Sequence, residues 1–197
     1  MNMSEIFTTA DFLLRSTAHE EVQSTSVRPL FIFILGAPGV GKGTISAFLK
    51  TAVPGLTHLS YGDLTRYHDG IPGTTIETGM RNHNQCIWLL DGFPRTGEHV
   101  AEWVAQLPPA DCTLYLFCPP EVSMERVAGR AATSGRLDDA NADRVRERVT
   151  RINAESGAML DALEAAGMRV ARVNTNRDLG TVKEEVLGIG SRPDVWI

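Results

Sequence analysis

Runs of apolar residues alternate with stretches of helical periodicity from residue 29 onward. Three runs, at 30–35, 86–90 and 113–117, are almost uninterrupted, which is typical of strands covered on both faces. Two shorter runs lie near 58–59 and at 168–173. The segments with helical periodicity are 43–53, 62–69, 74–83, 97–106, 121–130, 141–166 and 178–188. Strands that alternate with helices predict crossover connections and a parallel sheet, so we expect a three-layer α/β domain.

The first 28 residues do not follow this pattern. They are polar, and their acidic residues outnumber Arg15 and Arg28, unlike those of a transit peptide. We therefore predict a flexible N-terminal leader over 1–28, one domain over 29–190 and a tail over 191–197. A chain of 197 residues suits a single domain with a sizeable core.

Composition narrows the class of protein. Hydrophobic residues make up 43% of the chain and charged residues 22%, which is ordinary for a soluble globular fold. No apolar run approaches the length of a membrane helix, and a net charge of −5 argues against a nucleic-acid or anionic membrane surface. Cys86, Cys112 and Cys118 lie in or beside apolar runs without C-x-x-C spacing, which favours free thiols in a reducing compartment. We expect a cytoplasmic protein, with the nucleus and organelles as alternatives.

Most of the basic residues are arginines, and many of these lie in one segment of the chain. Of the 19 basic residues 16 are arginine, and seven of these lie between Arg126 and Arg151. Arginine is the residue that grips phosphate bidentately and keeps its charge when partly buried. The cluster alone fits a phosphate site and a solvated helix face equally well.

A glycine-rich string follows the strongest predicted strand and opens a helix, running from Gly36 to Thr44 as G-A-P-G-V-G-K-G-T. Its four glycines allow unusual backbone dihedrals, so that successive N–H groups can point at phosphate oxygens. Lys42 supplies a mobile charge for the β- and γ-phosphates, and Thr44 a hydroxyl near Mg²⁺. Gly43 separates these two residues, unlike the general phosphate-loop pattern. The alternative is a tight strand-to-helix turn with an exposed lysine, and the combination favours a nucleotide triphosphate site.

A second motif, D-G-F-P-R over 91–95, follows another predicted strand. The carboxyl ends of parallel strands are where ligands bind in an open sheet. Asp91 is a candidate for a water of the Mg²⁺ shell and Arg95 for a bridge between phosphates, while Gly92 and Pro94 fix the turn that aims Arg95. Such a turn alone is usually only a turn, and its position beside the phosphate loop favours a functional one.

The segment 125–139 reads as a helix end, a short Gly/Ser loop and the start of the long helix. A hinged loop with Arg130 and Arg136 can close over a transferring phosphoryl group and stabilise its charge. Arg148 lies beside an apolar helical stripe, so we expect it to face the cleft. Asp138 and Asp139 are candidates to cap the long helix or orient the arginines. We expect the remaining arginines of the long helix on its solvated side: Arg144, Arg146 and Arg151.

These motifs together resemble those of the nucleoside monophosphate kinases, the family of adenylate kinase and UMP/CMP kinase. The family pattern G-x-P-G-x-G-K-G-T matches 36–44 and D-G-[FY]-P-R matches 91–95. Residues 58–66, H-L-S-Y-G-D-L-T-R, resemble a further segment of the family, and about 130–141 resembles its short lid. Arg148 matches another catalytic arginine if Ala140 is a one-residue insertion.

The resemblance implies a three-layer α/β/α fold with a five-stranded parallel sheet and a short lid. It also implies direct in-line transfer from Mg²⁺-ATP to a nucleoside monophosphate, without a phosphoenzyme, by a monomer whose partners are small-molecule nucleotides. The implied catalytic residues are Lys42, Arg95, Arg130, Arg136 and Arg148. Those implied to bind ATP are Gly36, Pro38, Gly39, Val40, Gly41, Lys42, Gly43, Thr44, Arg126 and Arg130. Those implied to bind the acceptor are Ser60, Tyr61, Arg66, Gly92, Arg95, His99, Arg136 and Arg148, and Thr44 and Asp91 serve the metal.

The departures from the family pattern all lie on the acceptor side. Tyr61 replaces the usual Thr or Ala, and His99 replaces the usual Gln or Asn. Only 24 residues separate Arg66 from Asp91, about half the family's length, so we expect a high KM for the monophosphate. The string F-C-P-P at 117–120 leans towards the UMP/CMP branch over AMP.

Two alternatives stay open. The first is a catalytically impaired ATP-binding homologue that acts through partner binding, motivated by the shortened acceptor region. The second is a truncated chain that folds poorly, which a thermal melt with and without ATP would identify.

Overall fold

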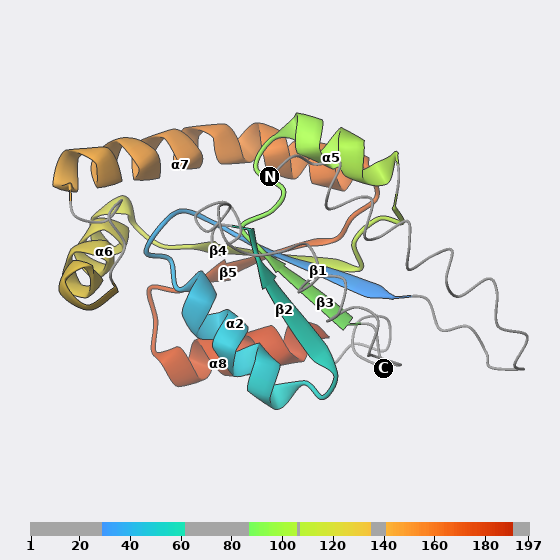
Figure 1. Cartoon of the computed structure of the whole chain (residues 1–197), viewed down its shortest axis with the longest axis horizontal. Coiled ribbons are helices and arrows are strands. Elements are labelled where there is room, and N and C mark those ends of the chain that lie inside the picture. The colour runs from blue at the N-terminus through green and yellow to red at the C-terminus, as the bar shows by residue number, and fades with distance from the viewer. Residues whose placement is uncertain (1–28, 62–86, 106, 135–140, 191–197) are drawn as a thin grey trace, which may run out of the picture.

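The structure is a computed structural model that describes residues 29–61, 87–105, 107–134 and 141–190. Five parallel strands form one sheet in the order β2-β3-β1-β4-β5 (Figure 1). The strands are β1 (Leu30–Leu35), β2 (Leu56–Ser60), β3 (Ile87–Asp91), β4 (Cys112–Phe117) and β5 (Val170–Asn174). The helices are α2 (Lys42–Ala52), α5 (Gly97–Val104), α6 (Pro120–Ser134), α7 (Ala142–Ala165) and α8 (Leu179–Gly190). The predicted five-stranded parallel sheet is confirmed.

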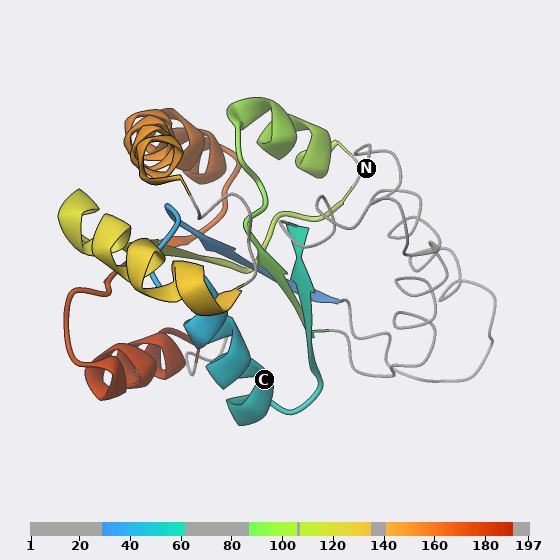
Figure 2. The ribbon, with the colours of Figure 1, turned by 60° about the vertical axis from the view of Figure 1, so that its left-hand side comes forward.

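Helices cover both faces of the sheet, as Figures 1 and 2 both show, with α2 and α8 on one side and α5 and α7 on the other. The side chains of β1 alternate between these two layers. Ile32 and Ile34 pack into the core beneath α2 and α8, whereas Phe31 and Phe33 pack into the core beneath α5 and α7. Burial on both faces explains why this strand has an almost continuous apolar sequence.

The helix boundaries differ from the predicted ones by only a few residues, except at α6. That helix continues to Ser134, four residues beyond its predicted end. The N-cap of α7 is Asn141, whose side chain accepts hydrogen bonds from the N–H groups of Asp143 and Arg144. Capping by Asp138 or Asp139 was therefore the wrong prediction, since Asn141 occupies the position directly before the first helical residue.

Several predictions lie outside the described residues. They concern the leader, the tail, the helices over 62–69 and 74–83, residues 135–140 of the lid, and the two residues Arg66 and Arg136. Within the described residues, no helix combines the length and the apolar character that crossing a membrane requires.

Sheet topology places the candidate motifs at one edge. The glycine-rich string leaves β1, the central strand, and the D-G-F-P-R motif begins at the end of the neighbouring β3. In the register of the sheet, Asp91 is opposite Ile34 on one side and Ser60 on the other. Because all five strands are parallel, the chain segments that follow them meet at the carboxyl edge of the sheet.

Candidate active site

Three glycines of the phosphate loop adopt a left-handed backbone, with φ of 135° at Gly36, 85° at Gly39 and 96° at Gly41. Two of them also lie too close to neighbouring backbone to accept a side chain. A Cβ at Gly36 would lie 2.2 Å from the carbonyl oxygen of Leu116, and one at Gly39 would lie 2.1 Å from that of Ser123. Gly43 does not have an unusual dihedral, contrary to prediction, because it already belongs to the first turn of α2.

The phosphate loop is held from the side by α6. The buried Ser123 donates its hydroxyl proton to the carbonyl oxygen of Pro38, 85 residues away in the sequence. The same residue forms the backbone wall against Gly39. The sequence does not predict this contact, because nothing in the spacing of residues 119–126 distinguishes Ser123 from any other serine on a helix.

Lys42 lies half-buried inside the loop, where its Nζ donates to the carbonyl oxygens of Gly36 at 2.6 Å and Ala37 at 3.0 Å. Its pKa is lowered from 10.5 to about 8, chiefly because burial removes water from the ammonium. Asp91 opposes this by favouring the charged form, whereas Arg130, Arg95 and Arg148 lower the pKa further. The predicted catalytic residues that the structure describes are thus within electrostatic reach of one ammonium group.

Asp91 ends β3 and is 9% exposed. Its Oδ2 accepts a hydrogen bond from the hydroxyl of Ser46 at 3.3 Å and lies 3.5 Å from Nε2 of His58. Asp91 and the exposed Thr44 line the same cavity. A carboxylate and a hydroxyl are oxygen donors of the kind that Mg²⁺ prefers, so the residues present fit this ion.

The cavity has a volume of about 940 Å³ and extends from the phosphate loop to α7. Arg126, Arg130 and Arg148 line it, and Arg130 and Arg148 are half-buried. Arg144 and Arg146 are exposed and lie outside the lining, as predicted. The prediction for Arg151 was wrong. This exposed residue lines the cavity because it follows Arg148 by nearly one helical turn, and residues 152, 155, 156 and 159 continue that face.

The predicted acceptor side separates into two groups. Ser60, Gly92, Arg95 and His99 line the cavity, whereas Tyr61 is absent from the lining among the described residues. The Tyr61 ring lies instead beneath Arg95, with the guanidinium carbon 4.6 Å from the ring centroid. His99 is stacked on Phe93 with ring centroids 5.5 Å apart, and its Nδ1 accepts a hydrogen bond from the backbone N–H of Arg95 at 3.2 Å.

Comparison with known proteins decides the family. No family model matches the chain. It is 32% identical over 188 residues to UMP-CMP kinase 3 of Arabidopsis thaliana, covering 83% of this chain and 90% of the relative. It is 30% identical over 194 residues to UMP-CMP kinase of Gallus gallus, covering 83% and 97%. It is also 27% identical over 207 residues to adenylate kinase 1 of Drosophila melanogaster, covering 89% of each chain.

The chain belongs to the nucleoside monophosphate kinase family.

This family member is shorter than its relatives within the aligned range. The alignment to the Gallus gallus protein spans 194 positions and nearly all of that relative, yet uses 83% of this 197-residue chain. Some positions of the relative therefore have no counterpart here. The sequence predicts that these positions fall in the short interval between Arg66 and Asp91.

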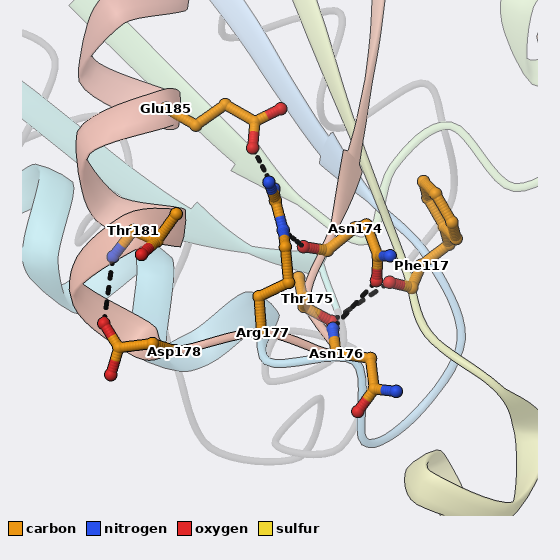
Figure 3. Close-up of polar contacts among 8 residues, drawn as sticks. All are labelled: Phe117, Asn174, Thr175, Asn176, Arg177, Asp178, Thr181 and Glu185. Carbon is orange, nitrogen blue, oxygen red and sulfur yellow. Dashed lines mark hydrogen bonds and ion pairs between the residues drawn. The ribbon is translucent and has the colours of Figure 1, made fainter.

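Arg126, which lines the cavity, connects α6 of this family member to the loop between β5 and α8. Its Nη2 donates to the carbonyl oxygen of Thr175 at 2.9 Å. The Thr175 hydroxyl in turn donates to the carbonyl oxygen of Phe117 at 3.1 Å. Figure 3 shows how the rest of this loop is fixed, with Arg177 paired to Glu185 and Asp178 accepting from the N–H of Thr181. Sequence reasoning missed the loop, although its turn-forming residues follow a strand at the carboxyl edge.

Proposed function

We propose that the chain transfers the γ-phosphoryl group of Mg²⁺-ATP to a nucleoside monophosphate and releases two nucleoside diphosphates. The observation that carries the proposal is the convergence of Lys42, Arg95, Arg130 and Arg148 on one cavity beside Asp91. Such a set suits phosphoryl transfer, in which catalysis consists largely of positioning and charge stabilisation. The names of the relatives, UMP-CMP kinase and adenylate kinase, agree with this chemistry.

In the proposed mechanism an oxygen of the acceptor phosphate attacks the γ-phosphorus in line, and the bond to the β-γ bridging oxygen breaks. The N–H groups of the phosphate loop and Lys42 hold the β- and γ-phosphates. Arg130 and Arg148 stabilise the charge on the transferring group, and Arg95 holds the acceptor phosphate. Thr44 and Asp91 would hold Mg²⁺, which when bound neutralises charge on the phosphates. The roles of Arg66 and Arg136 stay predictions from the sequence.

We propose a pyrimidine monophosphate, UMP or CMP, as the preferred acceptor, with AMP as the alternative. Two relatives named UMP-CMP kinase are 30% and 32% identical to the chain, whereas the adenylate kinase is 27% identical. The F-C-P-P string at 117–120 supports the same choice. We also propose that the protein works as a cytoplasmic monomer whose partners are nucleotides.

An acceptor panel tests the proposal. Purified protein is mixed with Mg²⁺-ATP and, in turn, with UMP, CMP, AMP and GMP, and diphosphate formation is measured against a Lys42→Met variant. We expect transfer to at least one pyrimidine acceptor. Turnover no higher than that of the variant with every acceptor would refute a kinase function.

The same assay gives the KM of each nucleotide. We expect a high KM for the monophosphate and an ordinary one for ATP, because the ATP side retains its phosphate loop and arginines whereas the chain is shortened relative to its family. Saturation by the monophosphate at the concentrations usual for the family would contradict this expectation.

A second candidate is an ATP-binding protein without transfer activity, favoured by the same shortening. Calorimetric titration distinguishes the two. Tight ATP binding together with no detectable monophosphate binding and no turnover would favour this second candidate.

ATP binding is expected to take up protons above pH 8. In the free protein Lys42 has a pKa of about 8, so its amine is increasingly neutral above that pH. Bound polyphosphate favours the charged form and raises the pKa, so binding must restore the proton, and ATP affinity falls as pH rises. At pH 8.5 the heat of binding should therefore depend on the ionisation enthalpy of the buffer, whereas at pH 6.5 Lys42 is already charged and contributes no uptake. Equal proton uptake by Lys42→Met would contradict the assignment.

A further inference from the structure

Arg95 lies at the active-site cavity, yet its side chain is exposed to solvent. It lines the cavity and lowers the pKa of Lys42, so its guanidinium acts on the same space as that ammonium. Its side chain is nevertheless exposed. An exposed arginine samples many rotamers, and fixing it in one costs conformational entropy. A catalytic arginine in such a place benefits from contacts that hold it in one rotamer.

Tyr61 provides such a contact. The guanidinium carbon of Arg95 lies 4.6 Å from the centroid of the Tyr61 ring, within the range of a cation–π interaction. Nε of Arg95 also donates to the carbonyl oxygen of Gly92 at 3.2 Å. The ring and this carbonyl therefore both hold the Arg95 side chain.

The Tyr61 ring is itself fixed by the aromatic core. Its centroid lies 5.6 Å from that of Phe93 and 6.4 Å from that of His99. Phe93 is 2% exposed and packs edge-on against Phe33 of the central strand. His99 stacks on Phe93 and accepts a hydrogen bond from the backbone N–H of Arg95. The Arg95 side chain and backbone thus contact one packed group of rings, formed by Tyr61, Phe93 and His99.

We propose that Tyr61 is a positioning residue that holds Arg95 towards the phosphate of the acceptor through the face of its ring. This inference rests on the proposed phosphoryl transfer, and it replaces the direct acceptor contact that the sequence predicts for Tyr61. Its position outside the cavity lining, among the described residues, agrees with an action through Arg95.

Fluorination of the ring tests the role of its π-face. The substitution Tyr61→Phe, and the same substitution with one, two and three fluorines on the ring, keep the shape of the side chain while progressively weakening its attraction for a cation. We expect Tyr61→Phe to retain kcat/KM within about twofold, and each fluorine to lower it stepwise. Tyr61→Leu should lower it about two- to fivefold, the range for an exposed cation–π contact. The change should appear in the KM of the monophosphate and leave the KM of ATP unaltered. A flat response across the fluorine series would overturn the proposal.

Phe48→Leu is the matched control. Phe48 also lies beneath a cation, with Nζ of Lys183 5.1 Å from its ring centroid, but in the layer between α2 and α8. Its replacement removes a contact of the same kind and should leave kcat/KM unchanged. An equal fall in both variants would mean that general loosening, and not the placement of Arg95, causes the effect.

A measurement without turnover separates this inference from the proposed function. Protons of the Arg95 side chain above the Tyr61 ring should resonate upfield in the NMR spectrum and return to ordinary positions in Tyr61→Leu. Absence of this upfield shift would overturn the Tyr61 contact even if the protein is an active kinase. Its presence in a protein that transfers no phosphate would support the contact while refuting the kinase function.

Discussion

Lys42→Met is expected to lower kcat by about a hundred- to a thousandfold, the loss typical of removing one preorganised hydrogen-bond donor to the charge of a transition state. Lys42 is the group on which the charges of this site converge. Burial, Arg95, Arg130 and Arg148 all disfavour its charged form. The site therefore carries an excess of positive charge that arriving phosphates relieve. Methionine keeps an unbranched side chain of nearly the same length and removes the charge.

The fold should tolerate this substitution. A lysine whose charge is disfavoured by burial and by three arginines contributes little to stability, so we expect the unfolding temperature to stay close to that of the unsubstituted protein. Lys50→Met is the matched control, since Lys50 is the exposed lysine in the last turn of the same helix. It should retain full activity. Comparable losses in both variants, or a kcat within tenfold for Lys42→Met, would disprove the role of Lys42.

The sheet could be predicted from sequence because its signal is local. Continuous apolar runs identify strands buried on both faces, and β1, β3 and β4 are such strands, with β1 in the centre of the sheet paired to β3 on one side and β4 on the other. The motifs that follow β1 and β3 could be placed together because strands of a parallel sheet share one carboxyl edge. No knowledge of side-chain contacts was needed for these predictions.

The contacts that support the site could not be predicted, because they join residues far apart in the chain. Ser123 holds Pro38 across 85 positions, and Arg126 holds Thr175 across 49. Which side of a helix faces the cavity could not be predicted for the same reason. The apolar stripe of α7 alone predicts that Arg151 faces solvent, but Arg151 lies on the face of that helix that lines the cavity. The rotation of a helix relative to a cavity is set by its neighbours.

A graded series of glycine substitutions should separate two constraints on the phosphate loop, the left-handed backbone of its glycines and the close approach of neighbouring backbone atoms. Ala at Gly39 meets both, because φ is +85° and the added Cβ would lie 2.1 Å from the backbone oxygen of Ser123. We expect Gly39→Ala to lower the free energy of unfolding by about 2–5 kcal/mol, the summed ranges of a left-handed residue and of overpacking, and to abolish ATP binding. Chemical denaturation and calorimetric titration measure the two effects.

The other loop glycines supply the controls. Gly41 has φ of +96° but nothing within 4 Å of its Cβ position, so Ala there should cost only the strain of a left-handed residue, about 1–2 kcal/mol. Gly43 has neither constraint, so Ala there should leave stability unchanged or raise it by up to about 1 kcal/mol. This order follows from the shape of the loop alone and holds whether or not the protein is an active kinase. Equal destabilisation at Gly39 and Gly43 would mean that α6 does not restrain the loop, and that the phosphate site is free to move relative to Arg126 and Arg130.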